Sequence, residues 1–390
     1  MLKNKIKNNK KIKSLYEFLF QRPIINFYNL RTPRKRVAYV YSTYHFKKGV
    51  YLSHSNYQES RAIVDIFNDL GYAVDIYNNN KSYKIDFSKY DVFFGEGDLI
   101  YDAIIARESK SCYQVVYYGT GSHPAYNNIQ SVKSLKRYIE KYDEVDIKYS
   151  RMVDEKWGAA ATLSDSAIVI GNEVTQESFS NNGQNNCHLL KPSIHSVIDA
   201  KSVIRSKDML KARKNILYFS SYGLVHKGLD LVIEIAKLTP DITYHLCGKL
   251  DSELTTDSKL ISQIDLLPNI IDHGFVKLDG DNFRNLMNCC AFALLPSCAE
   301  GMSTAVLTAM ANGGLIPIVT KQVGIDFGKF AIPIDSLCVG AMEHAIEISQ
   351  SMHLSDMHVR AVLSFEYAGK LNIDKFSGRI RECIENATIN

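Results

Sequence analysis

A loop at residues 220–230 has the residue types that bind a phosphate group. It follows a predicted strand and opens a predicted helix, and it holds Gly223 and Lys227. Gly223 would let the backbone approach a ligand closely, and Lys227 places a cation near the amino end of the helix. The helix dipole and the lysine both favour an anion. Taken alone, the pattern more often belongs to an ordinary loop with a surface lysine.

A second loop, farther along the chain, again lies between a predicted strand and a predicted helix. Glu300 stands at the mouth of this helix. The next four residues would turn backbone N–H groups and two hydroxyls toward an anion: Gly301, Met302, Ser303 and Thr304. The alternative is a carboxylate that caps its own helix.

Two polar clusters in the first half of the chain follow predicted strands, so they would lie at the carboxyl edge of a sheet. The clusters are His54, Asn56 and Glu59, and Thr120, Gly121 and His123. A histidine there could contact a substrate or guide a reacting hydroxyl, because its pKa lies near neutrality. The alternatives are a turn histidine bonded to backbone for His123, and an N-terminal capping pair for His54 and Glu59.

Alternating strands and helices would position these groups, and this alternation predicts an α/β fold with parallel sheets. Strands are predicted at 36–41, 73–77, 91–94, 114–118, 166–170, 215–220, 242–247, 269–273, 290–295, 315–319 and 331–333. Helices are predicted at 54–70, 131–141, 228–238, 283–288, 302–312, 340–351 and 355–385, the last with breaks at Gly369 and Gly378.

The length of 390 residues exceeds what one core supports, so two doubly wound domains are expected. We predict a basic segment at 1–35, domains at 36–190 and 215–354, and a linker at 191–214 between them. The helices at 355–390 are expected to pack back on the first domain. Ligands of such sheets bind at the carboxyl ends of the strands, which here would face a cleft between the domains.

The second domain resembles the donor domain of the retaining glycosyltransferases of family 4 (glycosyl transferases group 1), which have the GT-B fold. The resemblance is carried by segments 218–230, 246–248, 273–276, 295–302 and 310–319, in the family's order and spacing. The first domain resembles a GT-B acceptor domain more loosely. Together the two resemblances cover most of residues 36–385.

The resemblance implies a role for several residues. Lys227 would neutralise the phosphates of the donor, and Glu300 would bind a hydroxyl of the transferred sugar. The amides of 301–304 would hold the phosphates, and Phe275 and Val276 would lie near a nucleobase. Lys227, Glu300 and His123 are the predicted catalytic residues. No metal or other cofactor is expected, because GT-B enzymes usually work without one and no Asp-x-Asp motif lies in a suitable loop.

Two departures from the family pattern affect the donor. The family's Glu-x7-Glu pattern begins at Glu300, but its second position, which typically binds the ribose of a nucleotide, is Thr308. The arginine that often precedes the lysine is also missing, and Ser220 to Tyr222 occupy that region. The nucleoside of the donor is therefore open.

The charge is concentrated at the start of the chain. Net charge is +4, yet the first 36 residues hold 11 Lys or Arg and one acid, so the remainder is acidic. A basic amphipathic helix within residues 1–36 would suit an anionic membrane surface, and the alternative is a solvated N-terminus. A nucleic-acid partner is not expected, because no recognition motif is visible.

The remaining features indicate a cytoplasmic protein, with peripheral contact at the inner face of the cytoplasmic membrane as an option. No apolar run approaches the roughly 20 residues that span a bilayer, and no signal peptide is recognised. The eight cysteines are scattered and form no Cys-x-x-Cys pair, which argues against a zinc site or a disulfide framework.

We therefore expect a retaining glycosyltransferase. It would move a sugar from an activated sugar-phosphate donor, such as a sugar nucleotide, to a saccharide or lipid-linked saccharide. Surface polysaccharide synthesis, in a capsule or lipopolysaccharide, is the expected pathway. The alternatives are a GT-B sugar-nucleotide epimerase and a non-catalytic glycan- or nucleotide-binding module. Product analysis from donor alone would identify an epimerase, and donor hydrolysis would exclude a mere binding module.

Overall fold

The structure is a computed structural model that describes residues 22–33, 35–47, 54–107, 112–220, 222–250, 254 and 258–388. Most of the predicted basic segment at 1–35, including its amphipathic stretch, lies outside the described residues. In the described part of the chain, no helix combines the length and the apolar character that crossing a membrane requires.

The first domain is built on a six-stranded parallel sheet with the order β2-β1-β3-β4-β5-β6. Its strands are buried on both faces, as central parallel strands are, which explains their nearly continuous apolar sequences. They are β1 (Lys35–Tyr41), β2 (Tyr72–Asn78), β3 (Val92–Gly95), β4 (Gln114–Gly119), β5 (Ser166–Ile170) and β6 (Cys187–Leu190). The edge strand β6 was not predicted, since it is short and mostly only half-buried.

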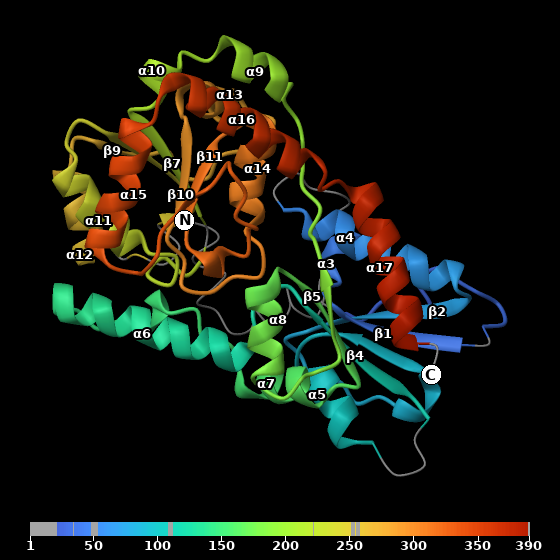
Figure 1. Ribbon diagram of the computed structural model, residues 1–390. Coiled ribbons are helices and arrows are strands. Elements are labelled where there is room, and N and C mark those ends of the chain that lie inside the picture. The colour runs from blue at the N-terminus through green and yellow to red at the C-terminus, as the bar shows by residue number, and fades with distance from the viewer. Residues whose placement is uncertain are drawn as a thin grey trace.

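The second domain has a six-stranded parallel sheet with the order β12-β11-β10-β7-β8-β9. Its strands are β7 (Asn215–Phe219), β8 (Thr243–Cys247), β9 (Ile270–Asp272), β10 (Phe292–Leu295), β11 (Ile316–Val319) and β12 (Ile332–Pro333). Each predicted strand is present within one or two residues of its expected ends. The predicted class, two α/β domains with parallel sheets, is confirmed (Figure 1).

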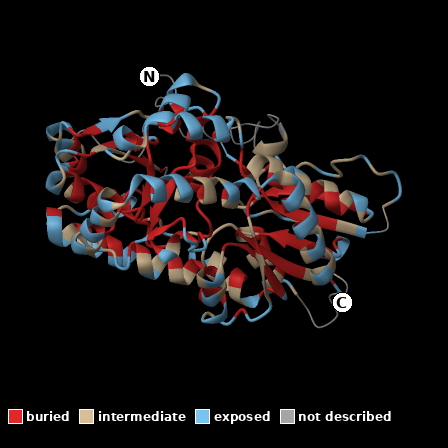
Figure 2. Cartoon of the chain, turned by 45° about the horizontal axis from the view of Figure 1, so that its top comes forward, coloured by how far each residue is buried: buried red, intermediate tan, exposed pale blue. Residues whose placement is uncertain are grey.

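Helices cover the faces of both sheets, and the strands form the buried centre of each domain (Figure 2). The first domain has α3 (Tyr44–Lys47), α4 (Asn56–Asp69), α5 (Asp98–Ile105), α6 (Pro124–Tyr142), α7 (Glu155–Leu163) and α8 (Glu173–Ser180). The second has α9 (Ala200–Ser206), α10 (Met209–Ala212), α11 (Leu229–Leu238), α12 (Lys259–Leu266), α13 (Asp281–Cys289), α14 (Thr304–Gly313), α15 (Val339–Ser351) and α16 (Leu354–Gly369). The last helix is α17 (Ile373–Thr388).

Two sequence predictions about helices need correction. Helix α6 begins at Pro124 rather than at 131, because His123 caps it and proline suits the first helical position. Gly378 does not interrupt the helix, since it lies inside α17. The predicted linker holds α9 and α10 in its second half.

The connection between the domains is fastened by side chains from both of them. The Glu59 carboxylate accepts hydrogen bonds from the amide and the hydroxyl of Ser193, at 2.6 and 2.9 Å. The Asn312 carboxamide accepts from the amides of Val197 and Ile198 at 2.7 and 3.0 Å. The extended segment 191–199 that joins the domains, here called the connecting strand although it is part of no sheet, is thereby held against α4 on one side and α14 on the other.

Helix α6 reaches from the first domain beneath the second (Figure 1). The guanidinium of Arg137 donates to both carboxylate oxygens of Asp230, at 2.9 and 3.0 Å, and Tyr142 donates to Glu234 at 2.7 Å. The domains therefore meet through charged and polar groups on this side of the cleft.

Helix α17 crosses back to the first domain and packs against α4 and β6. We expect Phe376→Ala, which empties a fully buried site on α17, to lower the free energy of unfolding by about 3–5 kcal/mol. Urea unfolding followed by circular dichroism measures this change. Arg379→Ala, at an exposed position of the same helix, serves as control and should shift stability by less than about 0.5 kcal/mol. Equal effects of the two substitutions would contradict a stabilising role for this contact.

Candidate active site

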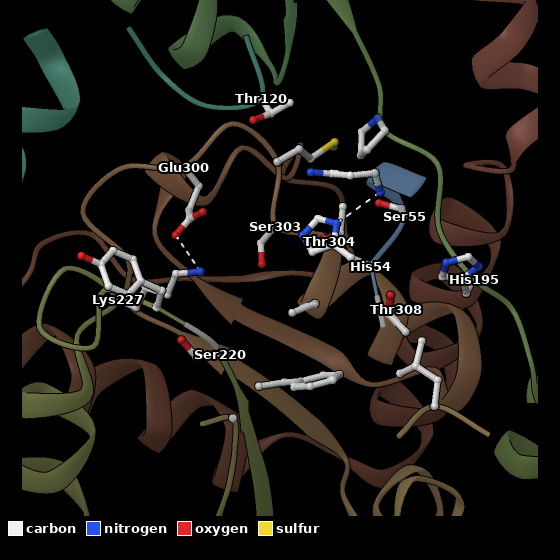
Figure 3. A pocket seen from close by; sticks show the side chains of 18 of the residues that line it. His54, Ser55, Thr120, His195, Ser220, Lys227, Glu300, Ser303, Thr304 and Thr308 are labelled. Atoms are coloured by element: carbon white, nitrogen blue, oxygen red, sulfur yellow. Dashed lines mark hydrogen bonds and ion pairs between the residues drawn. The ribbon is translucent and has the colours of Figure 1, made fainter. Parts of the chain in front are cut away.

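A cavity of about 440 Å³ lies between the two domains at the carboxyl ends of their strands. Both domains and the connecting strand contribute to its wall (Figure 3). The predicted site residues that line it are His54, Asn56, Glu59, Thr120, Lys227, Phe275, Val276, Glu300, Met302, Ser303 and Thr304. The structure thus brings both polar clusters and both phosphate loops, distant in sequence, to one place.

The buried carboxylate of Glu300 lies between two cations. Its Oε1 is 3.3 Å from Nζ of Lys227, and its Oε2 is 3.2 Å from a guanidinium nitrogen of Arg151 (Lys227 and Glu300 in Figure 3). Ser297 also donates its hydroxyl to Oε1 at 3.0 Å. Lys227 comes from the second domain and Arg151 from the first, so this contact spans the cleft.

The charges around Glu300 decide its protonation state. Burial would raise the pKa of this carboxyl group, but Lys227, Arg151, His226 and the Ser297 hydroxyl act against it and lower the pKa to about 2. Glu300 is therefore ionised at neutral pH. An ionised carboxylate can accept hydrogen bonds from sugar hydroxyls, or it can hold two cations in place for a bound anion.

The loop that carries Glu300 is pinned to the first domain. Ser122 donates its hydroxyl to the Glu300 carbonyl at 2.6 Å, and Thr175 donates to the Gly301 carbonyl at 3.3 Å. A Cβ on Gly301 would lie 2.4 Å from the carbonyl oxygen of Ile170 and 2.7 Å from that of Thr120. Only glycine permits this approach, which brings the two domains into direct backbone contact here.

The amino end of α14 opens on the cavity, with Ser303, Thr304 and Ala305 in the wall. The helix begins at Thr304, two residues later than predicted, and the amide of Ser303 donates to the Val323 carbonyl at 3.1 Å. The expected anion-binding set 301–304 is therefore corrected, because the Ser303 amide is already used. The N–H groups of the first turn, from Thr304 onward, lack intrahelical partners and suit an anion.

An aromatic side chain and a lysine lie in the wall of the second domain. The ring of Phe275 is half-exposed, and Nζ of Lys249 lies 5.1 Å from its centroid, while Val276 is buried beside it. An exposed aromatic face next to a cation suits the stacking of a planar ring.

On the opposite wall, His54 faces the cavity. Desolvation in the cleft and then the charges of Lys227 and Arg151 lower the pKa of His54 to about 4, so the ring is neutral at pH 7. Asn56 donates its amide to the Tyr41 hydroxyl at 2.6 Å. Burial raises the pKa of Glu59 to about 7 against its hydrogen bonds to Ser193.

The second domain matches a known family. Residues 213–346 fit the family model of the glycosyl transferases group 1. They form a group 1 glycosyl transferase domain. This match agrees with the predicted group 1 resemblance of the second domain and with the predicted glycosyltransferase activity. No curated protein matches the chain in sequence.

Solved structures confirm the GT-B fold of this transferase. The Anabaena protein HepE with UDP and glucose is 13% identical with a TM-score of 0.55, covering 90% of this chain and 100% of that one. The same protein with UDP-glucose is 13% identical with a TM-score of 0.58, and the match covers 90% of this chain and 99% of that one. Sucrose-phosphate synthase from Thermosynechococcus elongatus is 11% identical with a TM-score of 0.61, again covering 90% of this chain and 99% of that one.

The structure does not bring His123 into the cavity of the transferase. This buried residue caps α6, where Nδ1 accepts from the amide of Ala125 at 3.2 Å and Nε2 lies 3.1 Å from the Thr162 hydroxyl. Burial lowers the pKa of His123 to about 4. Both ring nitrogens serve the local fold, so its predicted catalytic placement is corrected. Gly121, Gly223 and Gly301 also lie outside the lining.

Sequence reasoning missed three polar residues of the wall: Arg151, His195 and Lys249. Arg151 precedes α7 in a stretch without a motif, and His195 lies in the connecting strand. Lys249 directly follows Gly248 of a segment that carries the family resemblance, which is the one signal that could have indicated it.

Among the described residues, one group of three side chains could hold a metal ion. It consists of His245, Cys289 and Cys290, whose ligand atoms lie within 4.8 Å of one another. The two nitrogens of His245 are each 2.9 Å from a partner, Asn215 and His273. These residues are not in the cavity wall, so the group is separate from the candidate active site.

The buried ion pair predicts a stability effect. Lys227→Met should lower the free energy of unfolding by about 3 kcal/mol at pH 7, because it leaves the Glu300 carboxylate buried with one cation fewer. Adding Glu300→Gln, which removes the charge, should restore most of the loss. Urea midpoints of the single and double variants measure this coupling, and purely additive effects would contradict it.

The same group predicts a dependence on pH. The pKa of Glu300 is about 2 in the folded chain, below its ordinary value of 4.5. Its contribution to stability is therefore complete above pH 4.5 and is lost as the pH falls toward 2. Glu300→Gln should lack this part of the acid destabilisation, as urea midpoints between pH 7 and 3 would reveal.

Proposed function

We propose that this transferase moves a sugar from a sugar nucleotide to a saccharide or lipid-linked saccharide, with retention of the anomeric configuration. One observation carries the proposal: two cations and the amino end of a helix converge around Glu300 in a cavity between two GT-B domains. This arrangement suits a diphosphate leaving group attached to a polar sugar.

In the proposed donor complex, Lys227, Arg151 and the first turn of α14 face the phosphates. Positive charge held in place before reaction stabilises the negative charge that develops as the bond between sugar and phosphate breaks. Arg151 compensates for the arginine that is missing before Lys227. The three groups supply this stabilisation from the protein itself, which supports a reaction without a metal.

In the proposed transfer step, the acceptor hydroxyl bonds to the anomeric carbon on the face from which the phosphate departs. The bond between that carbon and the phosphate oxygen breaks, and the acceptor proton passes to the departing phosphate. No nucleophile of the enzyme is required. The two carboxylates in the wall support this, because Glu59 is bound to Ser193 and Glu300 to its cations.

The wall residues suggest positions for the nucleobase, the transferred sugar and the acceptor. Phe275 and Lys249 suit the nucleobase, Glu300 the transferred sugar, and His54 and Thr120 the acceptor. The neutral ring of His54 could orient the acceptor hydroxyl. A sugar nucleotide as donor is supported by the similar fold of HepE, which was solved with UDP-glucose. The basic segment 1–36 supports a membrane-borne acceptor in surface polysaccharide synthesis at the cytoplasmic face.

A donor assay tests the proposal. Glu300→Ala should lower turnover by about 10²–10³ without unfolding the protein. Lys227→Ala and Arg151→Ala should weaken donor binding, more at low salt than at high salt, because the contacts are ionic. Release of nucleoside diphosphate from UDP-glucose, UDP-N-acetylglucosamine and GDP-mannose reports turnover, and proton NMR of the product reports its configuration.

Lys321→Ala is the matched control for the cation variants, since this lysine is exposed and outside the cavity. Normal turnover of a folded Glu300→Ala variant would contradict the proposed role of Glu300 in binding the transferred sugar. An inverted product would refute the retaining mechanism, and an epimerised sugar nucleotide without an acceptor would favour the epimerase.

The basic segment gives a separate prediction. Deleting residues 1–13, which hold six lysines, should leave transfer to a soluble acceptor unchanged but reduce binding to vesicles that contain anionic lipid. Co-sedimentation of the full and shortened chains with such vesicles measures this. Equal sedimentation would leave the N-terminus as a solvated segment.

A further inference from the structure

A cluster of nitrogen and sulfur ligands lies in the second domain, outside the wall of the cavity. It joins His245 of β8 to Cys289 and Cys290 at the end of α13, and within the described residues their ligand atoms all lie within 4.8 Å of one another. None of the three lines the cavity, so the proposed transfer reaction does not use them. A histidine and two cysteines form a ligand set that zinc prefers.

The fold turns these three side chains toward the same layer of the domain. By the register of β7 and β8, Phe219 and His245 lie on the same face of the sheet, because side chains alternate along each strand. The ring of Phe219 lies 6.3 Å from that of Phe283 on α13, so this helix covers that face. The helix ends at Cys289, and the backbone is extended at Cys290. The end of α13 thus delivers both thiols to the imidazole.

The separation of the two sulfur atoms fits a tetrahedral ion. Sγ of Cys289 lies 3.7 Å from Sγ of Cys290. Two thiolates that each lie about 2.3 Å from a zinc ion, at a tetrahedral angle of about 109°, are about 3.8 Å apart. The two sulfurs therefore stand at the separation that coordination of one ion requires, and binding needs little movement of either side chain.

The surroundings of His245 hold its ring in place for coordination. Its Nε2 lies 2.9 Å from Oδ1 of Asn215, and its Nδ1 lies 2.9 Å from Nε2 of His273. Both partner atoms can accept a hydrogen bond, so one nitrogen of His245 can keep its proton and its partner while the other binds the ion. Histidines that bind a metal are commonly oriented by such a hydrogen bond from the second ring nitrogen.

A buried cation stands beside the two thiols. Nζ of Lys207 donates to the carbonyl oxygens of Cys290 and Gly313, at 2.8 Å in each case. Its charge acts on the side chains of both Cys290 and Cys289. A neighbouring ammonium group favours thiolates, which are the form that binds a metal. Two thiolates and a divalent cation cancel in charge, so the bound ion adds no net charge beside the buried Cys290.

We propose that His245, Cys289 and Cys290 bind one zinc ion, which fastens the end of α13 to β8. Cys289 is exposed, so it gives the ion a path from solvent and leaves the fourth coordination position to water. This site stabilises the second domain and takes no part in sugar transfer, so the inference is independent of the proposed function. The sequence predicted no zinc site because it has no Cys-x-x-Cys pair, whereas here packing brings a distant histidine to two adjacent cysteines.

Cobalt substitution tests the ligand set. The reduced full-length protein, stripped of metal with a chelator that is then removed, is titrated with Co²⁺. The wild type should bind a single equivalent with a thiolate-to-cobalt charge-transfer band and the strong visible bands of a tetrahedral ion, and zinc should abolish both. Cys289→Ser should lose these bands at the same cobalt concentration. It should also weaken zinc binding at least about 100-fold, because loss of an outer partner alone typically costs 10–100-fold.

A matched control and a second readout accompany this titration. Cys338→Ser removes an exposed cysteine outside the cluster and should bind cobalt as the wild type does. Zinc should protect Cys289 from iodoacetamide, while the exposed Cys112 and Cys338 react equally with and without zinc, as mass spectrometry of the peptides would reveal. Zinc should also raise the thermal unfolding midpoint of the wild type but not that of His245→Gln, since an ion that binds only the folded chain stabilises it.

Three results would overturn the inference. Cobalt bands that persist in Cys289→Ser would place the ion elsewhere. A reduced wild type that gives no thiolate band would mean that the two cysteines are an ordinary thiol pair. Zinc binding that is equally weak in the wild type and in Cys289→Ser would mean an adventitious ion only. Should His245→Gln fail to fold, Cys289→Ser still decides the question, because it changes one atom at an exposed position.

Discussion

A carboxylate buried at a domain boundary needs positive partners, and Glu300 obtains one from each domain. Taking this charge out of water is unfavourable unless ion pairs and hydrogen bonds compensate. Lys227 satisfies it from the loop before α11, and Arg151 reaches it from the loop before α7. The Gly301 backbone approaches the first domain directly beside this carboxylate. These charges help to hold the two carboxyl edges together around the cavity.

The polar contacts on either side of the cavity extend this arrangement. Glu59 and Asn312 bind the connecting strand from opposite domains, and Arg137 pairs with Asp230 on the side of α6. Pro192 and His195 of the connecting strand line the cavity, so both domains and their connection surround the place proposed for the donor.

Much of the fold could be predicted because parallel strands buried on both faces leave a strong apolar signal. The loops around Lys227 and Glu300 could be recognised because each lies between a strand and a helix, where anion sites form. Helix α6 was placed too far along since its first turns contain Asn127 and Asn128, which obscure the apolar periodicity. Their amides serve tertiary contacts, with the carbonyls of Arg151 and Val153.

The residues that sequence reasoning missed share a physical reason. Arg151 and His195 have no local motif, and their roles arise from contacts with residues more than a hundred positions away, Glu300 and Asn312. His123 was wrongly predicted to face the cavity, because a histidine that follows a strand can equally cap the next helix. Local pattern identifies the loops of a site, whereas the partners from the facing domain emerge only from packing.

The chain passes between the domains twice, and the two passages lie side by side. The amide of Ile194 in the first donates to the carbonyl of Leu371 in the second, at 2.9 Å. The two passages therefore tie the domains together along one edge. Because α17 is seated on the first domain, a chain nicked in the first passage would still hold its halves together through the buried face of that helix. The second domain is thus inserted between two parts of the first domain, and both connections lie at the same edge.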